Sequence, residues 1–219
     1  MAVIPRTTDS TIFLEKNSND SLEGSLGDDR LQGGFQNDSL DGNSGDDRLQ
    51  GGFHDDSLDG NSGDDRLQGG FHDDSLDGGS GDDSLQGDYH DDVLYGGSGD
   101  DLLDGGFHDD MLYGGSGNDS LSGESGYDTL VGGDGADNFV FTYLNDVDII
   151  ADFNAEQGDK IIFDAATKIS EIADITVHVG VSHNNTAELE PVTSLYVDGT
   201  RIIEFDRVVS LQVENFEFV

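Results

Sequence analysis

The sequence predicts an all-β fold: a right-handed parallel β-roll, a β-helix or solenoid of nonapeptide repeats, closed by a C-terminal β cap. Three observations predict it. A block of nine residues repeats fourteen times without a gap from Glu15 to Val140. The sixth position of the block is always aspartate, and the eighth is leucine in thirteen blocks and Phe139 in the last. In every block after the first, glycine precedes the aspartate, where it favours a turn.

Positions seven to nine of each block predict a three-residue strand, such as Ser57–Asp59. Because side chains alternate between the two faces of a strand, the central leucine points inward and its neighbours point outward. A six-residue glycine-rich loop then reverses the chain, so that two blocks complete a coil of 18 residues. We expect two sheets around a thin leucine ladder, with coils about 4.8 Å apart and loops stacked along both edges.

The stacked loops bring the aspartates of successive coils together, for example Asp56 and Asp74. Two unit charges about 4 Å apart repel by roughly 4 kcal/mol at an intermediate dielectric, so a cation is needed between them. Calcium accepts six or more oxygen ligands at flexible angles, whereas magnesium keeps its waters and zinc prefers nitrogen or sulfur. If position six only favoured a turn, Asn or Ser would serve there equally well, yet no block has Asn or Ser at position six.

We therefore expect roughly ten to twelve Ca2+ ions between the loops. The predicted ligands are Asp20, Asp29, Asp38, Asp47, Asp56, Asp65, Asp74, Asp83, Asp92, Asp101, Asp110, Asp119, Asp128 and Asp137.

Composition supports the need for cations. The 219 residues include 48 acids against nine Lys and Arg, which gives a net charge of −39 with only 33% hydrophobic residues. Such a chain is expected to be disordered unless cations cancel its charge. Nucleic acid is excluded as a partner because two polyanions repel. The absence of cysteine excludes disulfides and thiolate metal sites.

The chain is expected to be secreted. No segment has the length of a membrane span, and residues 1–15 contain no apolar run suitable for a cleaved signal peptide. Calcium sites of modest affinity fill at millimolar extracellular calcium and stay largely empty in the cytosol. These observations predict an extracellular protein that leaves the cell by a route other than an N-terminal signal.

The two edges of the roll are expected to differ, because the full period is 18 residues. On one edge the fourth position is glycine. On the other edge it is a larger residue, and the third position is aromatic. These residues are Gln36, His54, His72, His90 and His108, with Phe35, Phe53, Phe71, Tyr89 and Phe107. Two interpretations stay open: stacked rings that stiffen the edge in a conformation usual for glycine, or a second metal or ligand site or acid sensor at the histidines.

The outward positions change along the chain. Early coils carry Arg30, Arg48 and Arg66 on one sheet and Asp41, Asp59 and Asp77 on the other, as solvated faces. Later coils carry apolar residues, which normally need a cover. These are Val93, Tyr95, Leu102, Met111, Tyr113 and Val131. We expect the C-terminal segment to fold over them, with a homodimer through these coils as the second choice.

The chain is expected to have three parts: an N-terminal capping segment (1–14), the roll (15–141) and a C-terminal β cap (142–219). Thr11–Leu14 predict a strand that covers the exposed first coil. Strands are also expected at 139–141, 148–153, 159–164, 175–179, 194–197 and 201–205. Asp198-Gly199 predicts a hairpin turn between the last two.

The repeats, of which Gly96-Gly97-Ser98-Gly99-Asp100-Asp101-Leu102-Leu103-Asp104 is a clear example, resemble the RTX (repeats-in-toxin) family. The stretch from Gly135 to Asp164 is similar to the C-terminal β-roll of serralysin-type proteases and alginate epimerase R-modules. The resemblance implies calcium binding by the position-six aspartates and turn carbonyls. It also implies export by type I secretion machinery, with Phe216-Glu217-Phe218-Val219 as a loose match to the terminal signal. The chain departs from the family at position four of one edge and in its first block.

The main functional hypothesis is a secreted calcium-binding protein that folds on binding calcium after type I secretion. The alternative is a calcium-dependent module that binds polysaccharide or a cell surface through an outward sheet face or the aromatic edge. An enzyme is not expected, because the sequence offers no nucleophile–base pair and no phosphate loop.

Overall fold

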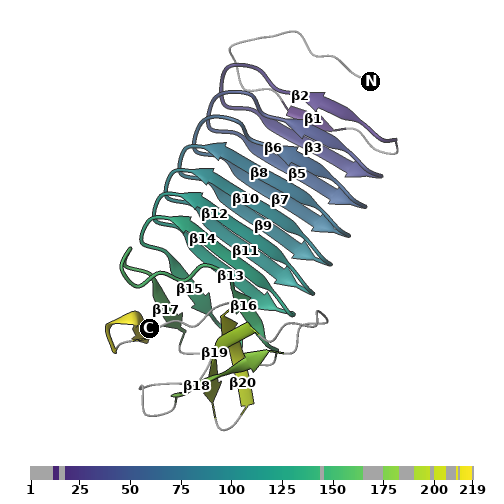
Figure 1. Cartoon of the computed structure of the whole chain (residues 1–219). Helices are drawn as coiled ribbons and strands as arrows, with labels where there is room; N and C mark the ends of the chain where they lie inside the picture. Colours follow the sequence, from purple (N-terminus) through teal and green to yellow (C-terminus); the bar gives the residue numbers. More distant parts are fainter. Residues whose placement is uncertain are drawn as a thin grey trace.

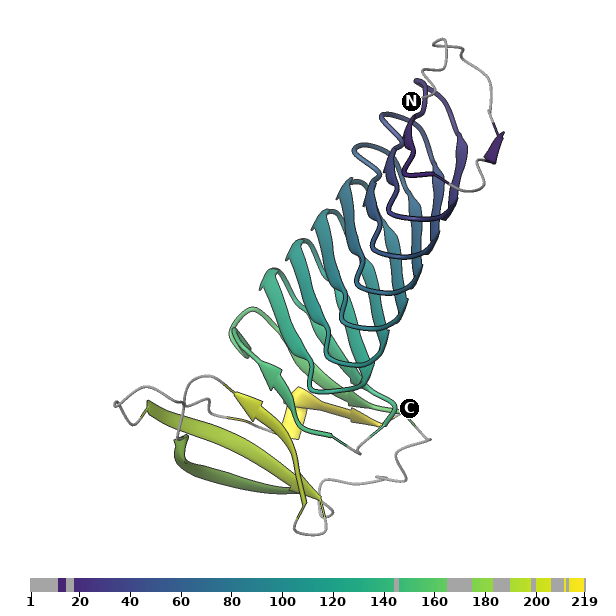
Figure 2. The ribbon, with the colours of Figure 1, turned by 90° about the vertical axis from the view of Figure 1, so that its right-hand side faces the viewer.

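The computed structural model describes residues 12–14, 18–143, 146–164, 175–182, 190–197, 200–205, 211 and 213–218. They form an elongated roll of two long sheets that face each other, with the C-terminal strands at one end (Figures 1 and 2). The predicted all-β parallel roll is confirmed. Asp198-Gly199 and Thr11 lie outside the described residues.

The first sheet has ten strands, and we call it sheet A. Its strands, in spatial order, are β1 (Ile12–Leu14), β3 (Arg30–Phe35), β5 (Arg48–Phe53), β7 (Arg66–Phe71), β9 (Ser84–Tyr89), β11 (Leu102–Phe107), β13 (Ser120–Ser125), β15 (Asn138–Phe141), β17 (Lys160–Phe163) and β21 (Phe216–Phe218). A 3-10 turn, η3 (Val213–Asn215), leads into β21.

The second sheet, sheet B, has eleven strands. From the N-terminal end they are β2 (Ser21–Glu23), β4 (Ser39–Asp41), β6 (Ser57–Asp59), β8 (Ser75–Ser80), β10 (Val93–Ser98), β12 (Met111–Ser116), β14 (Thr129–Asp134), β16 (Asp148–Ile150), β20 (Thr200–Phe205), β19 (Glu190–Val197) and β18 (Ile175–Ser182).

Within the repeats each residue pairs with the residue 18 positions later, for example Leu49 with Leu67 and Leu58 with Leu76. The predicted coil of two blocks is therefore confirmed. Phe35 and Phe53 are one pair of residues related by this 18-residue step, and the centroids of their rings are 4.9 Å apart. This distance is close to the spacing of hydrogen-bonded strands, as expected for adjacent coils.

Most strands are longer than expected. Three-residue strands occur in β2, β4 and β6, whereas β3 and β5 span six residues and include the first three positions of the next block. In these longer strands the glycine at position one is buried on the same side as the leucine, so the alternation of faces continues into the next block. Only the remaining three residues form the turn.

The core is a single file of leucines between the sheets, each at most 2% exposed from Leu22 to Leu130. At the C-terminal end aromatic side chains widen it. The rings of Phe139 and Phe153 are 6.1 Å apart, and Phe153 meets Phe205 edge-on at 5.6 Å. Because the leucine file alone is thin, these larger rings close the end of the roll.

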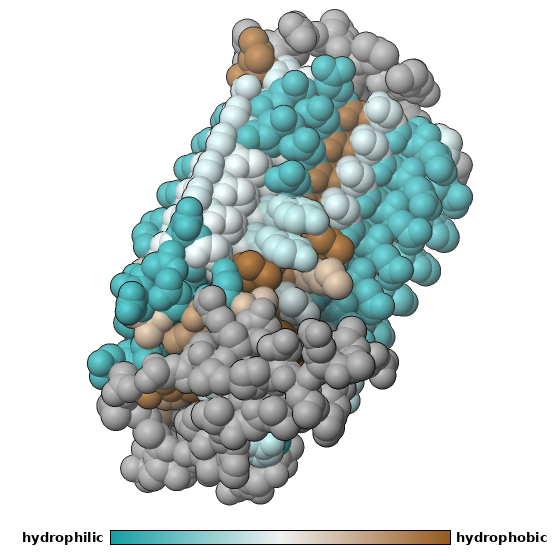
Figure 3. Space-filling view, viewed as in Figure 1, coloured by the Kyte–Doolittle hydropathy of each residue, from teal (hydrophilic) through white to brown (hydrophobic). Residues whose placement is uncertain are grey.

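The described C-terminal strands extend both sheets and do not fold back over the later coils. β20 pairs with β16 and β21 pairs with β17, each in parallel. Tyr95, Leu102 and Met111 remain 42%, 52% and 48% exposed, so the expected intramolecular cover over them is not formed by the described residues. Figure 3 shows hydrophobic patches among hydrophilic ones on one face of the roll.

Candidate metal-binding loops

The fourteen predicted aspartates form two columns, one along each edge of the roll. The glycine-edge column holds Asp29, Asp47, Asp65, Asp83, Asp101, Asp119 and Asp137, and the histidine-edge column holds Asp20, Asp38, Asp56, Asp74, Asp92, Asp110 and Asp128. All are buried except Asp20, which is partly buried.

One oxygen of each carboxylate links neighbouring coils. The backbone N–H of Asp56 donates to Oδ1 of Asp74 at 2.7 Å, and the backbone N–H of Asp65 donates to Oδ1 of Asp83 at 2.7 Å. The same bond recurs along both columns because the coil repeat places each loop directly on the next. The Asp side chain is long enough for its Oδ1 to reach the N–H of the neighbouring coil at this spacing.

The other oxygen is left for a cation. Oδ2 is buried and has no hydrogen-bond partner in every described column aspartate except Asp29. Oδ2 of Asp29 instead accepts hydrogen bonds from the backbone N–H and the hydroxyl of Ser25 at 2.5 and 2.8 Å. Burying a carboxylate oxygen without a partner is unfavourable by several kcal/mol. Such a column is stable as a set of anions only when positive charge lies beside it.

Backbone oxygens lie close to these unpaired carboxylate oxygens. A Cβ added to Gly60 would lie 2.3 Å from Oδ2 of Asp65 and 2.7 Å from the carbonyl oxygen of Gly78, one coil later. On the histidine edge, a Cβ on Gly87 would lie 2.3 Å from Oδ2 of Asp92 and 2.5 Å from the carbonyl oxygen of Gly105. A carboxylate and a carbonyl from adjacent coils therefore converge where glycine leaves room.

This donor set fits calcium. Calcium is bound by carboxylate and carbonyl oxygens at roughly 2.3–2.6 Å with flexible angles. Among the described residues, no three His, Cys, Asp or Glu side chains gather around one point. The loop carbonyls beside Oδ2 are the further protein oxygens available there, and oxygen donors suit calcium better than zinc, which prefers nitrogen and sulfur.

Without a bound cation, burial strongly raises the pKa of the column carboxyls. Burial, opposed by the hydrogen bond from Asp56 and reinforced by the charge of Asp92, raises the pKa of Asp74 to about 8. Burial likewise raises the pKa of Asp110 to about 9 and that of Asp47 to about 7. These groups would take up protons at neutral pH if no metal ion neutralised them.

Two further aspartates extend the columns, and the sequence prediction missed them. The backbone N–H of Asp128 donates to Oδ1 of Asp148, and that of Asp137 donates to Oδ1 of Asp159, both at 3.1 Å. The separations are 20 and 22 residues, so the strict period of 18 does not find them. A usable signal was present, because each is followed two residues later by a buried isoleucine, Ile150 or Ile161.

The neighbouring aspartates at position five behave differently. The backbone N–H of Asp100 donates to Oδ1 of Asp82 at 2.9 Å, and that of Asp82 donates to Asp64 at 3.0 Å, so these bonds point toward the preceding coil. The position-five side chains are exposed. Asn118 occupies the same position and accepts from Ala136 at 3.1 Å. Asn118 therefore makes the position-five bond without a charge, and Tyr127 and Ala136 occupy the same position in the last two blocks.

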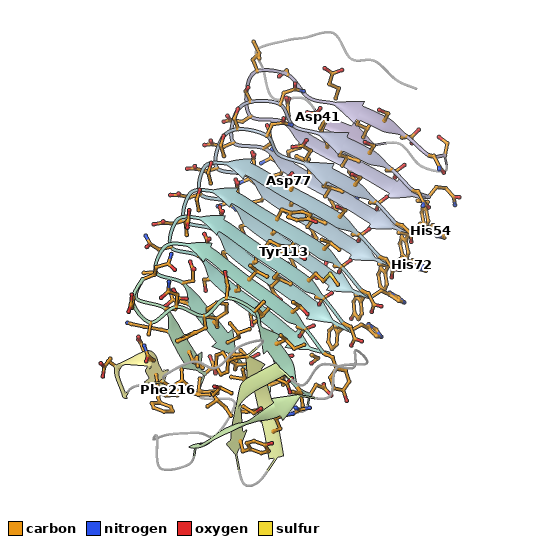
Figure 4. The ribbon with its side chains drawn as sticks, viewed as in Figure 1. Asp41, His54, His72, Asp77, Tyr113 and Phe216 are labelled. Carbon is orange, nitrogen blue, oxygen red and sulfur yellow. The ribbon has the colours of Figure 1, made fainter. Side chains whose placement is uncertain are left out.

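The histidine ladder is a stack of nearly parallel rings. Centroids are 5.0 Å apart for His54 and His72 and 5.1 Å apart for His90 and His108 (Figure 4). Nδ1 of His108 accepts the backbone N–H of His90 at 3.2 Å, and all four residues have φ between 78° and 85°. Parallel rings do not converge on one metal ion. The geometry favours the interpretation that the histidines stiffen the edge.

The aromatic ladder beside it is equally regular. Successive rings from Phe35 to Phe107 are 4.8–5.0 Å apart and within 8° of parallel. The ring faces therefore cover one another, and side-chain exposure of about 41–52% comes mainly from the edges. Because a sugar stacks on the face of an aromatic ring, this geometry gives no support to polysaccharide binding along the aromatic edge.

A parallel roll whose two edges carry columns of buried aspartates defines a repeat protein built around metal-binding loops. Residues 16–49, 50–85, 86–121 and 113–141 match the family of the RTX calcium-binding nonapeptide repeat in four copies. The matches cover more than half of the sequence, and the chain therefore belongs to this family. It is a calcium-binding RTX-type protein, and its roll is a structural calcium-binding unit rather than a catalytic one.

No curated protein matched the chain by sequence. Among solved structures, the chain is similar to an extracellular lipase, LipA, from Serratia marcescens, with 18% identity and a TM-score of 0.30. The match covers 98% of this chain and 43% of the lipase chain, so the chain spans less than half of that protein's length. None of the described residues forms a helix long and apolar enough to span a membrane.

Proposed function

We propose that this protein is secreted, stays unfolded where calcium is scarce, and folds into the roll when calcium binds between the stacked loops. The proposed ligands are the fourteen aspartates of the two columns together with loop carbonyls. The observation that carries the proposal is the series of buried Oδ2 atoms that have no hydrogen-bond partner. Since the sites exist only when coils stack, the free energy of calcium binding contributes directly to the free energy of folding.

Asp148 and Asp159 bear on the number of ions. They add one further interval between aspartates on each edge, beyond the repeats themselves. We therefore place the capacity at or slightly above the roughly ten to twelve ions expected from the repeats alone. The first interval on the glycine edge is the weakest, because Ser25 already satisfies Oδ2 of Asp29.

We propose that export precedes folding. Phe216–Phe218, which belong to the loose match to a type I secretion signal, form β21 and pair with β17 in the folded sheet. Secretion machinery that reads these residues has to engage them before the sheet forms. An unfolded chain in low cytosolic calcium and a folded roll in millimolar extracellular calcium satisfy this requirement, and folding at the exit would oppose return of the chain.

The test is a calcium titration of the full chain followed by far-ultraviolet circular dichroism, starting in excess chelator. We expect a disordered spectrum that changes cooperatively to a β-sheet spectrum as free calcium rises toward millimolar. Magnesium at the same concentrations is the control and should leave the spectrum disordered, because it dehydrates reluctantly. A β-rich spectrum in chelator at about pH 9, above most of the raised pKa values of the column carboxyls, would contradict the proposal.

A further inference from the structure

The outer face of sheet A carries an arginine column on its first coils. Arg30 pairs with Arg48 and Arg48 with Arg66, so three exposed guanidinium groups follow one another at the spacing of adjacent strands. A parallel column of glutamines lies two residues further along each strand. We call this surface the arginine face. A groove of about 410 Å³ runs between its two columns, above Leu31, Leu49 and Leu67. Its sides are lined by Arg30, Gln32, Arg48, Gln50, Arg66, Gln68, Ser84 and Gln86.

These arginines have no carboxylate partner within the described part of the chain. The ion pairs there join Lys160 to Glu217 and Arg201 to Glu204, both in the C-terminal region. The chain has only nine Lys and Arg against 48 acids, yet three of the nine are stacked on one face with no ion pair to a described residue. Like charges at this spacing repel, so a row of anions across the groove would stabilise them.

The outer face of sheet B on the same coils is the chemical complement. Asp41 pairs with Asp59 and Asp59 with Asp77, and exposed serines form the column beside them. We call this the aspartate face. Figure 4 labels Asp41, Asp77 and Tyr113, which occupy alternate positions of the same column. These acids belong to the strands and not to the loops, so the calcium columns do not use them.

The two faces match in spacing as well as in charge. Both columns repeat once per coil, because hydrogen bonding between strands fixes the distance between coils. They also occupy the same N-terminal part of the roll and lie on opposite sides of it. The arginine face of one molecule can therefore oppose the aspartate face of another with arginine against aspartate and glutamine against serine at successive coils.

We infer that the calcium-loaded roll associates with further copies of itself by laying its arginine face on the aspartate face of a neighbour. The interface is heterologous, so each assembly keeps one free arginine face at one end and one free aspartate face at the other, and association continues laterally. Arginine suits this role because its planar guanidinium pairs with a carboxylate through two hydrogen bonds. Exposed ion pairs over a small area make each contact weak, and association is expected at high protein concentration.

The inference goes beyond the proposed function and requires only that the roll be folded. The experiment is sedimentation velocity of the full chain in saturating calcium, over a concentration series extending to the submillimolar range. Circular dichroism on each sample reports folding separately, so loss of association is distinguished from loss of the roll. We expect the weight-average sedimentation coefficient of the wild type to rise with concentration.

Two charge-reversal variants test the pairing. One is Arg48→Glu with Arg66→Glu, which makes both faces acidic, and the other is Asp59→Arg with Asp77→Arg, which makes both faces basic. Each alone should lose the concentration dependence, and an equimolar mixture should regain it. Lys160→Glu with Arg201→Glu is the control matched to the first variant, since it changes the net charge by the same amount and in the same direction outside both faces, and it should associate as the wild type does.

Three results would overturn the inference: a wild type that stays monomeric throughout the series, single-face variants that associate like the wild type, or a mixture that fails to regain association. A monomeric wild type that binds polygalacturonate, and loses that binding in the Arg48→Glu, Arg66→Glu variant, would also overturn it and assign the arginine face to an acidic glycan.

Discussion

At the scale of single residues, the position-six aspartate divides two tasks between its two oxygens. Oδ1 accepts the N–H of the loop one coil earlier, and Oδ2 lies buried beside glycine with no protein partner. Asparagine could still accept the N–H hydrogen bond, but it would put an uncharged NH2 group where the charged Oδ2 lies. Serine has one hydroxyl oxygen and could not supply both the acceptor and the buried anionic oxygen. The invariance of this residue therefore follows from a hydrogen bond and a cation site that share one side chain.

Asp83→Asn should raise the calcium concentration at the folding midpoint several-fold, because it removes the charge of one central carboxylate from the glycine-edge column. Asp82→Asn is the matched control, with the same charge change one residue away. It should leave the midpoint nearly unchanged, since Asn118 already occupies the equivalent position. The measurement is a calcium titration by circular dichroism. Equal shifts in the two variants would show that general charge, and not the column, controls binding.

The column carboxyls also predict a pH dependence for the calcium-free chain. Their pKa values in the folded roll are raised from an ordinary value near 4 to about 7 for Asp83, about 8 for Asp74 and about 9 for Asp110, chiefly by burial. Groups whose folded pKa is raised favour the folded state most below the unfolded pKa, and this contribution disappears as pH rises through the folded values.

In chelator, the chain should therefore gain β structure near pH 4 and lose it between about pH 6 and 9. In saturating calcium the roll should persist across the upper part of this range, because the ions replace the protons. Circular dichroism at each pH, with and without calcium, checks both statements. A calcium-free chain that is more ordered at pH 9 than at pH 4 would show that protonation of the columns does not stabilise the roll.

The sequence was enough to predict which aspartates form the two columns, because the same loop pattern recurs every 18 residues along each edge and each recurrence places an aspartate at the same position. The conformational role of His72 was also predictable, since it replaces a loop glycine and adopts φ of 81°. What the sequence left open was ring orientation. Whether four histidines converge on a metal or stack in parallel depends on the side-chain torsions, and the hydrogen bond from His72 N–H to Nδ1 of His90 settles this only in three dimensions.

At the scale of strands and coils, the roll depends on a core one residue thick. Each coil contributes two leucines, and each is almost completely buried. Leu76→Ala should lower the free energy of unfolding by about 2–5 kcal/mol, because a thin core cannot rearrange to fill the cavity. Ser75→Ala, on the exposed side of the same strand, should change it by less than about 0.5 kcal/mol. Urea denaturation in saturating calcium measures the free energy of unfolding of both variants. Equal losses in the two variants would contradict the conclusion that the leucines form the core of the repeats.

Element boundaries were the less predictable part. The alternation of buried and exposed positions continues from Leu49 through Gly51, but glycine carries no hydrophobic signal and is more typical of a turn. The extension of the aspartate columns to Asp148 and Asp159 was hidden for a similar reason. Loops that are two and four residues longer than the repeat break the period while preserving an aspartate two residues before a buried isoleucine.

At the scale of the whole molecule, the same acids that define the fold oppose it. A net charge of −39 on 219 residues expands the chain, and the leucine file offers little burial to offset that repulsion. In the proposed mechanism, calcium acts on both terms, because it lowers the net charge and joins consecutive coils. An ion held by oxygens from two coils would make each coil that forms help its neighbour, as in other repeat proteins.

This coupling predicts a large change of size on binding calcium. An unfolded chain of this length has a radius of gyration of about 50 Å, and a compact one about 17 Å, with an elongated roll somewhat above the latter. Small-angle X-ray scattering should therefore show more than a halving of the radius between chelator and saturating calcium. Sodium chloride at matched ionic strength is the control. Sodium chloride screens the repulsion between the acids but does not bridge coils, so it should reduce the radius of gyration only slightly. An equal reduction in sodium chloride would mean that charge screening, and not calcium between the loops, drives folding.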